Sequence, residues 1–167
     1  RIGTLRLPPH HRALPRGEVR LHFLAQPLQA PVESLDFVGT ILAAFADAGA
    51  RAGERIGGAF EELGSLPESY QAYQDALALA VESGDAELQS ELHSAIGINQ
   101  AYSADRSELL DGAERHCRTA LDISRRERGT RLEAKALTCL GEVIYARGDD
   151  LELALANYRQ AEQLWAS

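Results

Sequence analysis

The chain has 167 residues, a formal net charge of −8 at pH 7 and 45% hydrophobic residues. This is enough for one domain with a sizeable core, and no apolar run reaches the roughly 18 residues that a membrane span needs. The negative charge argues against nucleic acid as a partner, because an acidic surface repels the phosphate backbone.

The charge is unevenly distributed along the chain. Residues 1–34 hold five arginines and two glutamates, which gives +3, whereas residues 35–105 hold two arginines and twelve acidic residues, which gives −10. The acidic middle favours a basic partner. The opposite charges also leave open a salt-sensitive contact between the two segments, within one molecule or between neighbouring molecules.

Proline dominates the first part of the chain. Five of the six prolines fall there: Pro8, Pro9, Pro15, Pro27 and Pro31. Proline fixes φ and removes a donor, so no long helix can run through this part. The stretches 2–7 and 18–24 alternate apolar and polar residues, as strands of a small hairpin do. We interpret residues 1–34 as a Pro-rich arm or linker, irregular or short-β, with a poorly ordered terminus as the alternative.

After this arm, Ala, Leu and Glu dominate, and apolar residues recur at spacings of three and four, which predicts amphipathic helices. The sequence predicts seven of them, at 34–48, 50–63, 67–82, 86–102, 108–127, 131–147 and 151–166. Gly64, Gly84 and Gly148 are predicted to end three helices, Gly64 as a left-handed cap. Asp85, and Asp149 or Asp150, are predicted to cap the helices that follow. The chain over 35–167 is therefore expected to be all-α.

The helical part carries an internal repeat of about 40 residues. Gly57, Gly97 and Gly141 recur at this period, each inside a predicted helix. Glycine costs about 1 kcal/mol relative to alanine there, and close packing of two helices is the natural offset. The same role is predicted for alanines on the second helices: Ala76, Ala113, Ala120, Ala154 and Ala161. The repeat units cover the ranges 50–85, 86–129 and 130–167.

The last unit carries Leu140-Gly141, then Gly148-Asp149, then Ala154, Tyr158 and Ala161. This order resembles a tetratricopeptide repeat of the long-period variety, with one extra residue in the turn after Gly148. The first unit matches too, whereas the middle unit is weaker and holds about four extra residues around 103–108. The resemblance implies a right-handed superhelix of stacked antiparallel helix hairpins, a tetratricopeptide-like solenoid.

In this family the first helices of successive units line a concave groove, and residues flanking the small mid-helix position contact the ligand. The resemblance thus implies a partner-binding groove of acidic and aromatic character. Its candidate residues are Arg51, Glu54, Glu61, Glu62, Glu91, Ser94, Tyr102, Lys135, Thr138, Glu142 and Tyr145. The groove lacks the cluster of Lys and Arg with which some family members bind a peptide carboxylate. The alternative is an ordinary solvated helix face.

The function implied by the resemblance is a protein-interaction scaffold that binds a peptide or helix of a partner, within a larger protein. The partner is a protein or peptide, the acidic charge favours a basic one, and self-association is a further option. No cofactor, metal, nucleic acid or membrane is expected. The alternative is a ligand-sensing regulatory segment of a signalling or transcriptional regulator.

Residues that could carry catalysis are few, and we expect no enzyme. The adjacent His116 and Cys117 suggest a thiolate–imidazole pair, but neighbouring residues on a helix do not face each other. The dyad His10-His11 has no further metal ligands at suitable spacing. The two cysteines, Cys117 and Cys139, fall in helical patterns and are predicted to be reduced and packed, which favours the cytoplasm.

Overall fold

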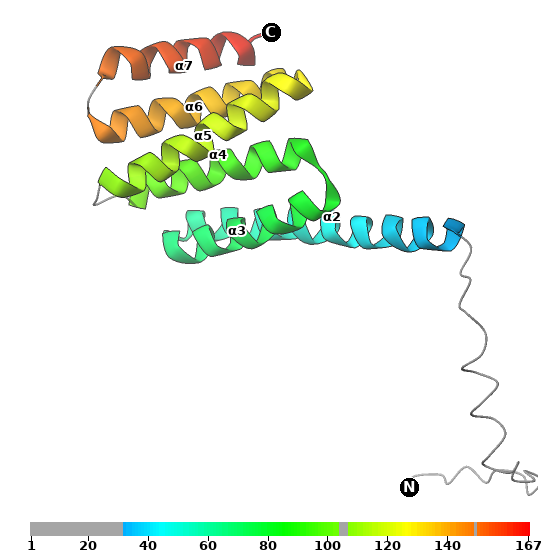
Figure 1. Ribbon diagram of the computed structural model, residues 1–167. Coiled ribbons are helices and arrows are strands. Elements are labelled where there is room, and N and C mark those ends of the chain that lie inside the picture. Colours follow the sequence, from blue (N-terminus) through cyan, green and yellow to red (C-terminus); the bar gives the residue numbers. More distant parts are fainter. Residues whose placement is uncertain (1–31, 104–106, 149) are drawn as a thin grey trace, which may run out of the picture. The chain divides into compact units, whose positions relative to one another are not determined.

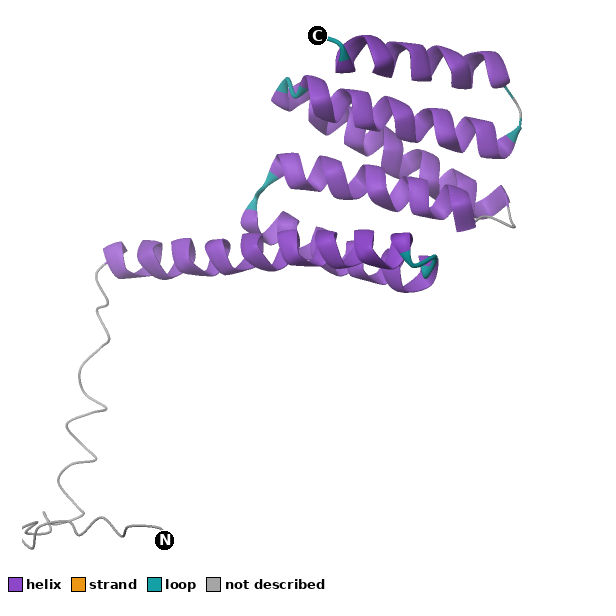
Figure 2. Ribbon diagram, turned by 180° about the vertical axis from the view of Figure 1, so that it is seen from behind, coloured by secondary structure: helices purple, strands orange, loops and turns teal. Residues whose placement is uncertain are grey.

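A computed structural model of the chain describes residues 32–103, 107–148 and 150–167. Every regular element in these ranges is a helix (Figures 1 and 2), and the predicted all-α fold is confirmed for this part of the chain. The helices are α2 (Val32–Glu62), α3 (Leu66–Ser83), α4 (Ala86–Ser103), α5 (Ser107–Glu127), α6 (Thr130–Arg147) and α7 (Leu151–Trp165). The strands predicted at 2–7 and 18–24 lie outside the described residues.

The chain divides into two compact units, Arg1–Phe37 and Val38–Ser167. Within the second unit, three hairpins, α2/α3, α4/α5 and α6/α7, follow one another (Figure 1). Helix α4 contacts α3, α5 and α6, and α6 contacts α5 and α7. Because α4 and α6 touch although α5 separates them along the chain, the first helices of the second and third hairpins are neighbours.

One predicted boundary is wrong. The sequence placed a break at Gly49, but α2 runs without interruption from Val32 to Glu62 and begins inside the predicted arm. A lone glycine in a helix costs only about 1 kcal/mol relative to alanine and is not enough to end it. Gly49 also lies close to α3, because a Cβ added there would be 3.0 Å from Cδ1 of Leu79.

The other helix ends agree with the local sequence. Gly64, Gly84 and Gly148 have φ angles of 74°, 75° and 74°, in the left-handed region that favours glycine. The side chains of Asp85 and Asp150 accept hydrogen bonds of 3.0 and 2.9 Å from backbone N–H groups in the first turns of α4 and α7. These predicted caps are confirmed, and they set the short turns that fold the helices into hairpins.

The predicted close packing at the mid-helix glycines is confirmed in the first and last hairpins. A Cβ added at Gly57 would lie 2.5 Å from Cδ1 of Tyr73, and one added at Gly141 would lie 2.6 Å from Cε1 of Tyr158. Each tyrosine comes from the second helix of the same hairpin. The separation is 16 residues in the first pair and 17 in the last, as expected from the extra residue after Gly148.

In the middle hairpin the same place is taken by sulfur. A Cβ added at Gly97 would lie 2.6 Å from Sγ of both Cys117 and Cys139, and 3.1 Å from the carbonyl oxygen of Ala113. Cys117 follows Gly97 by 20 residues, which is 16 plus the four extra residues of this unit. Cys117 therefore stands where the other hairpins have tyrosine, and Cys139 from α6 fills the remaining space.

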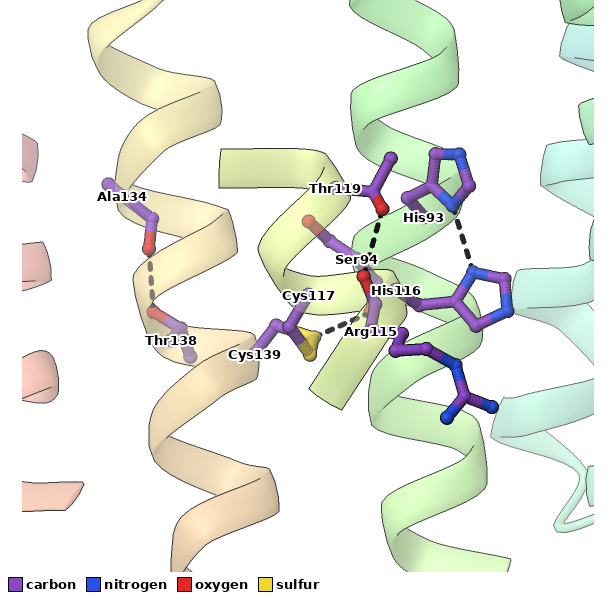
Figure 3. The surroundings of a disulfide bond; sticks show 9 residues. All are labelled: His93, Ser94, Arg115, His116, Cys117, Thr119, Ala134, Thr138 and Cys139. Carbon is purple, nitrogen blue, oxygen red and sulfur yellow. Dashed lines mark hydrogen bonds between the residues drawn. A yellow bond between two sulfur atoms is a disulfide. The ribbon is translucent and has the colours of Figure 1, made fainter. Parts of the chain in front are cut away.

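Cys117 and Cys139 are joined by a disulfide (Figure 3). Both are fully buried, so the prediction that they are packed is confirmed, but the prediction that they are reduced is wrong. The reason is geometric, since α5 and α6 both approach Gly97 and bring the two Cα atoms to 5.5 Å, within the range that a disulfide spans. The cysteines therefore no longer favour a reducing compartment.

Small residues also fill the remaining helix crossings. All five alanines predicted on second helices are at most 2% exposed: Ala76, Ala113, Ala120, Ala154 and Ala161. On the first helices, Leu88, Leu92 and Ile96 of α4 are at most 1% exposed and form a core with α3. This packing holds the groove-side surface of α2, α4 and α6 in place.

Candidate functional site

A groove of about 550 Å³ lies across α2, α4 and α6. Six of the residues predicted for the binding face line it, two from each of these helices: Glu54, Glu61, Glu91, Ser94, Lys135 and Thr138. The fold brings together residues that are up to 84 positions apart in the sequence. Three separate helices contribute to one hollow, which is the arrangement that a binding groove requires.

The groove also contains residues that the sequence did not predict. They are Arg55, Gly58, Tyr73, Ala95, Ile98 and Trp165. Tyr73 reaches the groove from the second helix α3 because Gly57 leaves room for its ring. Trp165 comes from the end of α7. The adjacent apolar residues Leu164 and Trp165 are the sequence feature that could have indicated a contact there. Gly58 could have been found from its place one turn from both Glu54 and Glu61 on the same helix face.

Five predicted residues lie outside this groove. Arg51 is exposed and pairs with Asp47 at 3.2 Å and with Asp85 at 2.5 Å, so that it links α2 to the start of α4. Glu62 is exposed at the end of α2. These two side chains are solvated or engaged elsewhere, and the structure does not bring them to the groove.

The other three predicted residues lie farther along α4 and α6. The hydroxyl of Tyr102 donates a 3.2 Å hydrogen bond to Glu142, which joins the two helices. Tyr102 and Tyr145 are each 64% exposed. Both side chains are open to solvent, and neither lines the groove.

An ion pair crosses the groove between α4 and α6. Nζ of Lys135 donates to Glu91 at 2.6 Å, and Arg131 approaches the same carboxylate at 3.7 Å. Glu54 of α2 lies half-buried nearby, and burial together with the charge of Glu91 raises its pKa, although Lys135 and Arg131 act in the opposite direction. The cationic charge in this region is thus held mainly by Glu91.

Two hydroxyl groups of residues that line the groove, those of Tyr73 and Ser94, differ in their hydrogen bonding. The hydroxyl of Tyr73 donates a 3.0 Å hydrogen bond to Glu61, and burial followed by the charge of Glu61 raises the pKa of this tyrosine. Ser94 is 3% exposed, and its hydroxyl has no hydrogen-bond partner among the described residues. A buried hydroxyl without a hydrogen-bond partner lowers the free energy of unfolding by about 1–3 kcal/mol.

A second hollow of about 460 Å³ lies among α5, α6 and α7 and contains several arginines. Arg147 pairs with Asp111 at 2.9 Å and with Glu114 at 2.8 Å, while Arg118 pairs with Glu114 at 2.6 Å. The hydrogen bond from Arg147, followed by that from Arg118, holds the pKa of Glu114 below its usual range. These charges form a structural network between α5 and α6, not an anion site.

Two histidines, one on α4 and one on α5, form a pair (Figure 3). Nδ1 of His93 and Nδ1 of His116 are 2.8 Å apart, so one ring donates and the other accepts. His116 therefore faces His93, while its neighbour Cys117 is bound to Cys139. The two neighbours do not form a thiolate–imidazole pair. Within the described ranges, no group of three or more His, Cys, Asp or Glu could hold a metal ion.

The histidine pair predicts a pH dependence of stability. Burial, followed by the charge of His116, lowers the pKa of His93 from 6.5 to about 4, and burial also lowers the pKa of His116. Between these two pH values the unfolded chain binds protons that the folded pair excludes, so stability is full above pH 6.5 and falls as the pH falls. We expect His93 to account for a loss of about 1 kcal/mol between pH 7 and 5, after discounting for partial exposure.

The measurement is denaturant unfolding at pH 7, 6 and 5 for the wild type and for His93→Gln. The variant should lose less stability over this range, because glutamine takes up no proton. Parallel pH profiles of the two proteins would show that the pair does not titrate as the geometry implies.

No family model matches this chain, and no curated protein matches it. None of the helices in the described part is long and apolar enough to cross a membrane.

Proposed function

We propose that the chain is a tetratricopeptide-like scaffold segment that binds a peptide or helix of a partner protein in the groove across α2, α4 and α6. The observation that carries this proposal is the convergence of the six predicted residues on one hollow of about 550 Å³. A surface helix face with no binding role needs no such hollow spanning three hairpins.

The architecture supports the proposal. Three helix hairpins follow one another, and α4 and α6 are in contact. Equivalent glycines face side chains of the second helices, which are tyrosines in two units and Cys117 in the middle one. A constant rotation between such units gives a superhelix with one extended face. We expect it to be right-handed, with α2, α4 and α6 on the concave side.

The chemistry of the groove suits a peptide. Ala95, Ile98 and Trp165 supply apolar surface, while carboxylates stand on the α2 side. A mixture of apolar surface and a few polar groups is typical of binding sites.

The same volume also suits a small molecule, since ligand pockets of about 300–1,000 Å³ are common. This favours ligand sensing as a second candidate. A thermal-shift comparison separates the two, because a ligand that binds the folded state raises its stability. Stabilisation by metabolites and not by peptides would select the sensor.

The test of peptide binding begins with selection from a library of random peptides displayed on phage, with the wild-type protein as the target. Thr138→Arg places a large side chain in the groove, and we expect it to weaken the selected peptides about tenfold. Thr119→Arg is the matched control on α5, outside the groove. Each threonine hydroxyl donates to the carbonyl four residues earlier, Thr138 at 3.0 Å and Thr119 at 2.9 Å (Figure 3).

The control should bind the selected peptides as the wild type does. Equal affinities for the two variants would place the site elsewhere, and a library that yields no binder would remove the peptide-binding proposal. Circular dichroism of both variants establishes that the helices are intact.

A further inference from the structure

We infer that the groove recognises an arginine or lysine side chain of the peptide, seated over Gly58 between the carboxylates of Glu54 and Glu61. This inference rests on the proposed function and adds the chemistry of the ligand. It commits to a basic peptide as the occupant.

The surface of α2 over Gly58 has open space. A Cβ added at the neighbouring Gly57 would strike the ring of Tyr73, but one added at Gly58 would meet only Oη of Tyr73, at 3.8 Å. Gly58 lines the groove and fills none of it. The surface of α2 is therefore hollowed at this residue without any packing reason.

The carboxylates of Glu54 and Glu61 lie on either side of Gly58 along α2. Glu54 precedes Gly58 by four residues and Glu61 follows it by three, so all three lie on one face of α2. The two glutamates are about 10 Å apart along the helix axis. A side chain that enters between them has an acidic group on either side.

The neighbouring cations form ion pairs with carboxylates other than Glu54 and Glu61. Lys135 and Arg131 approach Glu91, and Arg51 pairs with Asp47 and Asp85: these contacts are 2.6, 3.7, 3.2 and 2.5 Å long. Among the described residues, Glu54 and Glu61 form no ion pair. Arg55 also lines the groove, but it is exposed to solvent, where its charge is screened.

Burial supports this account of Glu54. Desolvation is the main cause of its raised pKa, and the charge of Glu91 adds to it. A half-buried carboxylate beside another carboxylate gains from a bound cation. Glu61 is already oriented by the hydroxyl of Tyr73 at 3.0 Å, which leaves its remaining lone pairs for a ligand.

The groove also has apolar and aromatic lining residues outside α2. Ala95 and Ile98 of α4 offer apolar surface to the methylene stem of an arginine or lysine, and Trp165 offers an aromatic ring. Ser94 lies on the same wall, 3% exposed, and its hydroxyl is the unpartnered group described above. Together these residues provide for the stem and the charge of a basic side chain.

The experiment uses the full chain and the strongest peptide from the phage library. We expect this peptide to contain arginine or lysine. If it holds a lysine, that residue is replaced by arginine, and the peptide is then compared with its citrulline counterpart, which keeps the shape and removes the charge. The arginine form should bind about tenfold more tightly to the wild type.

The protein variant is Glu54→Gln/Glu61→Gln, with Glu82→Gln on α3 as the control for loss of an exposed acidic charge. The double variant should bind the arginine peptide about tenfold more weakly and the citrulline peptide within about twofold of the wild type. The control should retain the full preference for arginine.

The outcomes separate this inference from the proposed function. Selected peptides without a basic residue, or equal affinity of the arginine and citrulline forms for the wild type, would overturn the basic-residue site while leaving the groove as a peptide site. Selection of acidic peptides would point instead to Arg55 and Lys135. A library without any binder would overturn both proposals.

Discussion

Replacing Gly57 by alanine is expected to lower the free energy of unfolding by about 2 kcal/mol. Alanine favours a helix by about 1 kcal/mol over glycine, so this loss has to come from packing. The new Cβ would lie 2.5 Å from Cδ1 of Tyr73. That ring is 4% exposed and is anchored by its hydrogen bond to Glu61, so it cannot move aside freely. Urea unfolding followed by circular dichroism measures the change.

Gly58→Ala is the matched control, one residue along the same helix. Its Cβ would meet only Oη of Tyr73, at the ordinary contact distance of 3.8 Å. We therefore expect an increase of about 0.5–1 kcal/mol in the free energy of unfolding, from helix propensity and reduced freedom of the unfolded chain. If the two alanines have the same effect, the close contact at Gly57 is contradicted.

Removing the disulfide is expected to lower the free energy of unfolding by about 3 kcal/mol. Cys117 and Cys139 are 22 residues apart, and their bond restricts the unfolded chain over that loop. The bond also supplies the side-chain volume that tyrosine provides opposite Gly57 and Gly141, so its loss loosens the contact of α5 and α6 with α4. Unfolding with and without a reductant measures this effect in the wild type.

Cys117→Ala/Cys139→Ala is the control for the disulfide. It should be less stable than the oxidised wild type and insensitive to the reductant. Thiol titration of the wild type, unfolded without reductant, should detect no free thiol. Two free thiols per chain would contradict the disulfide and would restore the prediction of reduced cysteines.

Features that depend on short stretches of sequence could be predicted well. The left-handed glycines Gly64, Gly84 and Gly148 and the capping residues Asp85 and Asp150 act within one turn of their own positions. Helix type follows from apolar spacing in the same local way. Such features need no knowledge of which helices meet.

The glycine repeat reached further, because a helix with an interior glycine indicates a close neighbour. It predicted close contacts at Gly57, Gly97 and Gly141, whereas the residues expected to face a groove followed from the resemblance to tetratricopeptide repeats. The glycine repeat does not cover Gly49, which lies close to α3 in the interior of α2, although the sequence predicts a helix boundary there. Local sequence does not distinguish a glycine that ends a helix from one that packs inside it.

Contacts between distant helices could not be predicted. The pairing of Lys135 with Glu91 spans 44 residues, and the disulfide depends on a Cα separation that only the packed helices define. The entry of Tyr73 and Trp165 into the groove likewise depends on how α3 and α7 lie against the first helices. The resemblance named six of the residues that line the hollow, but not their partners within it.

The most direct test of the binding groove is an NMR titration of the isotope-labelled wild type with the strongest library peptide. We predict the largest amide shifts on three helices at once, around Glu54 of α2, Ala95 of α4 and Thr138 of α6, which line the groove. Shifts concentrated on the outer faces of α3 and α5, with the groove amides unchanged, would contradict the binding site proposed for this protein.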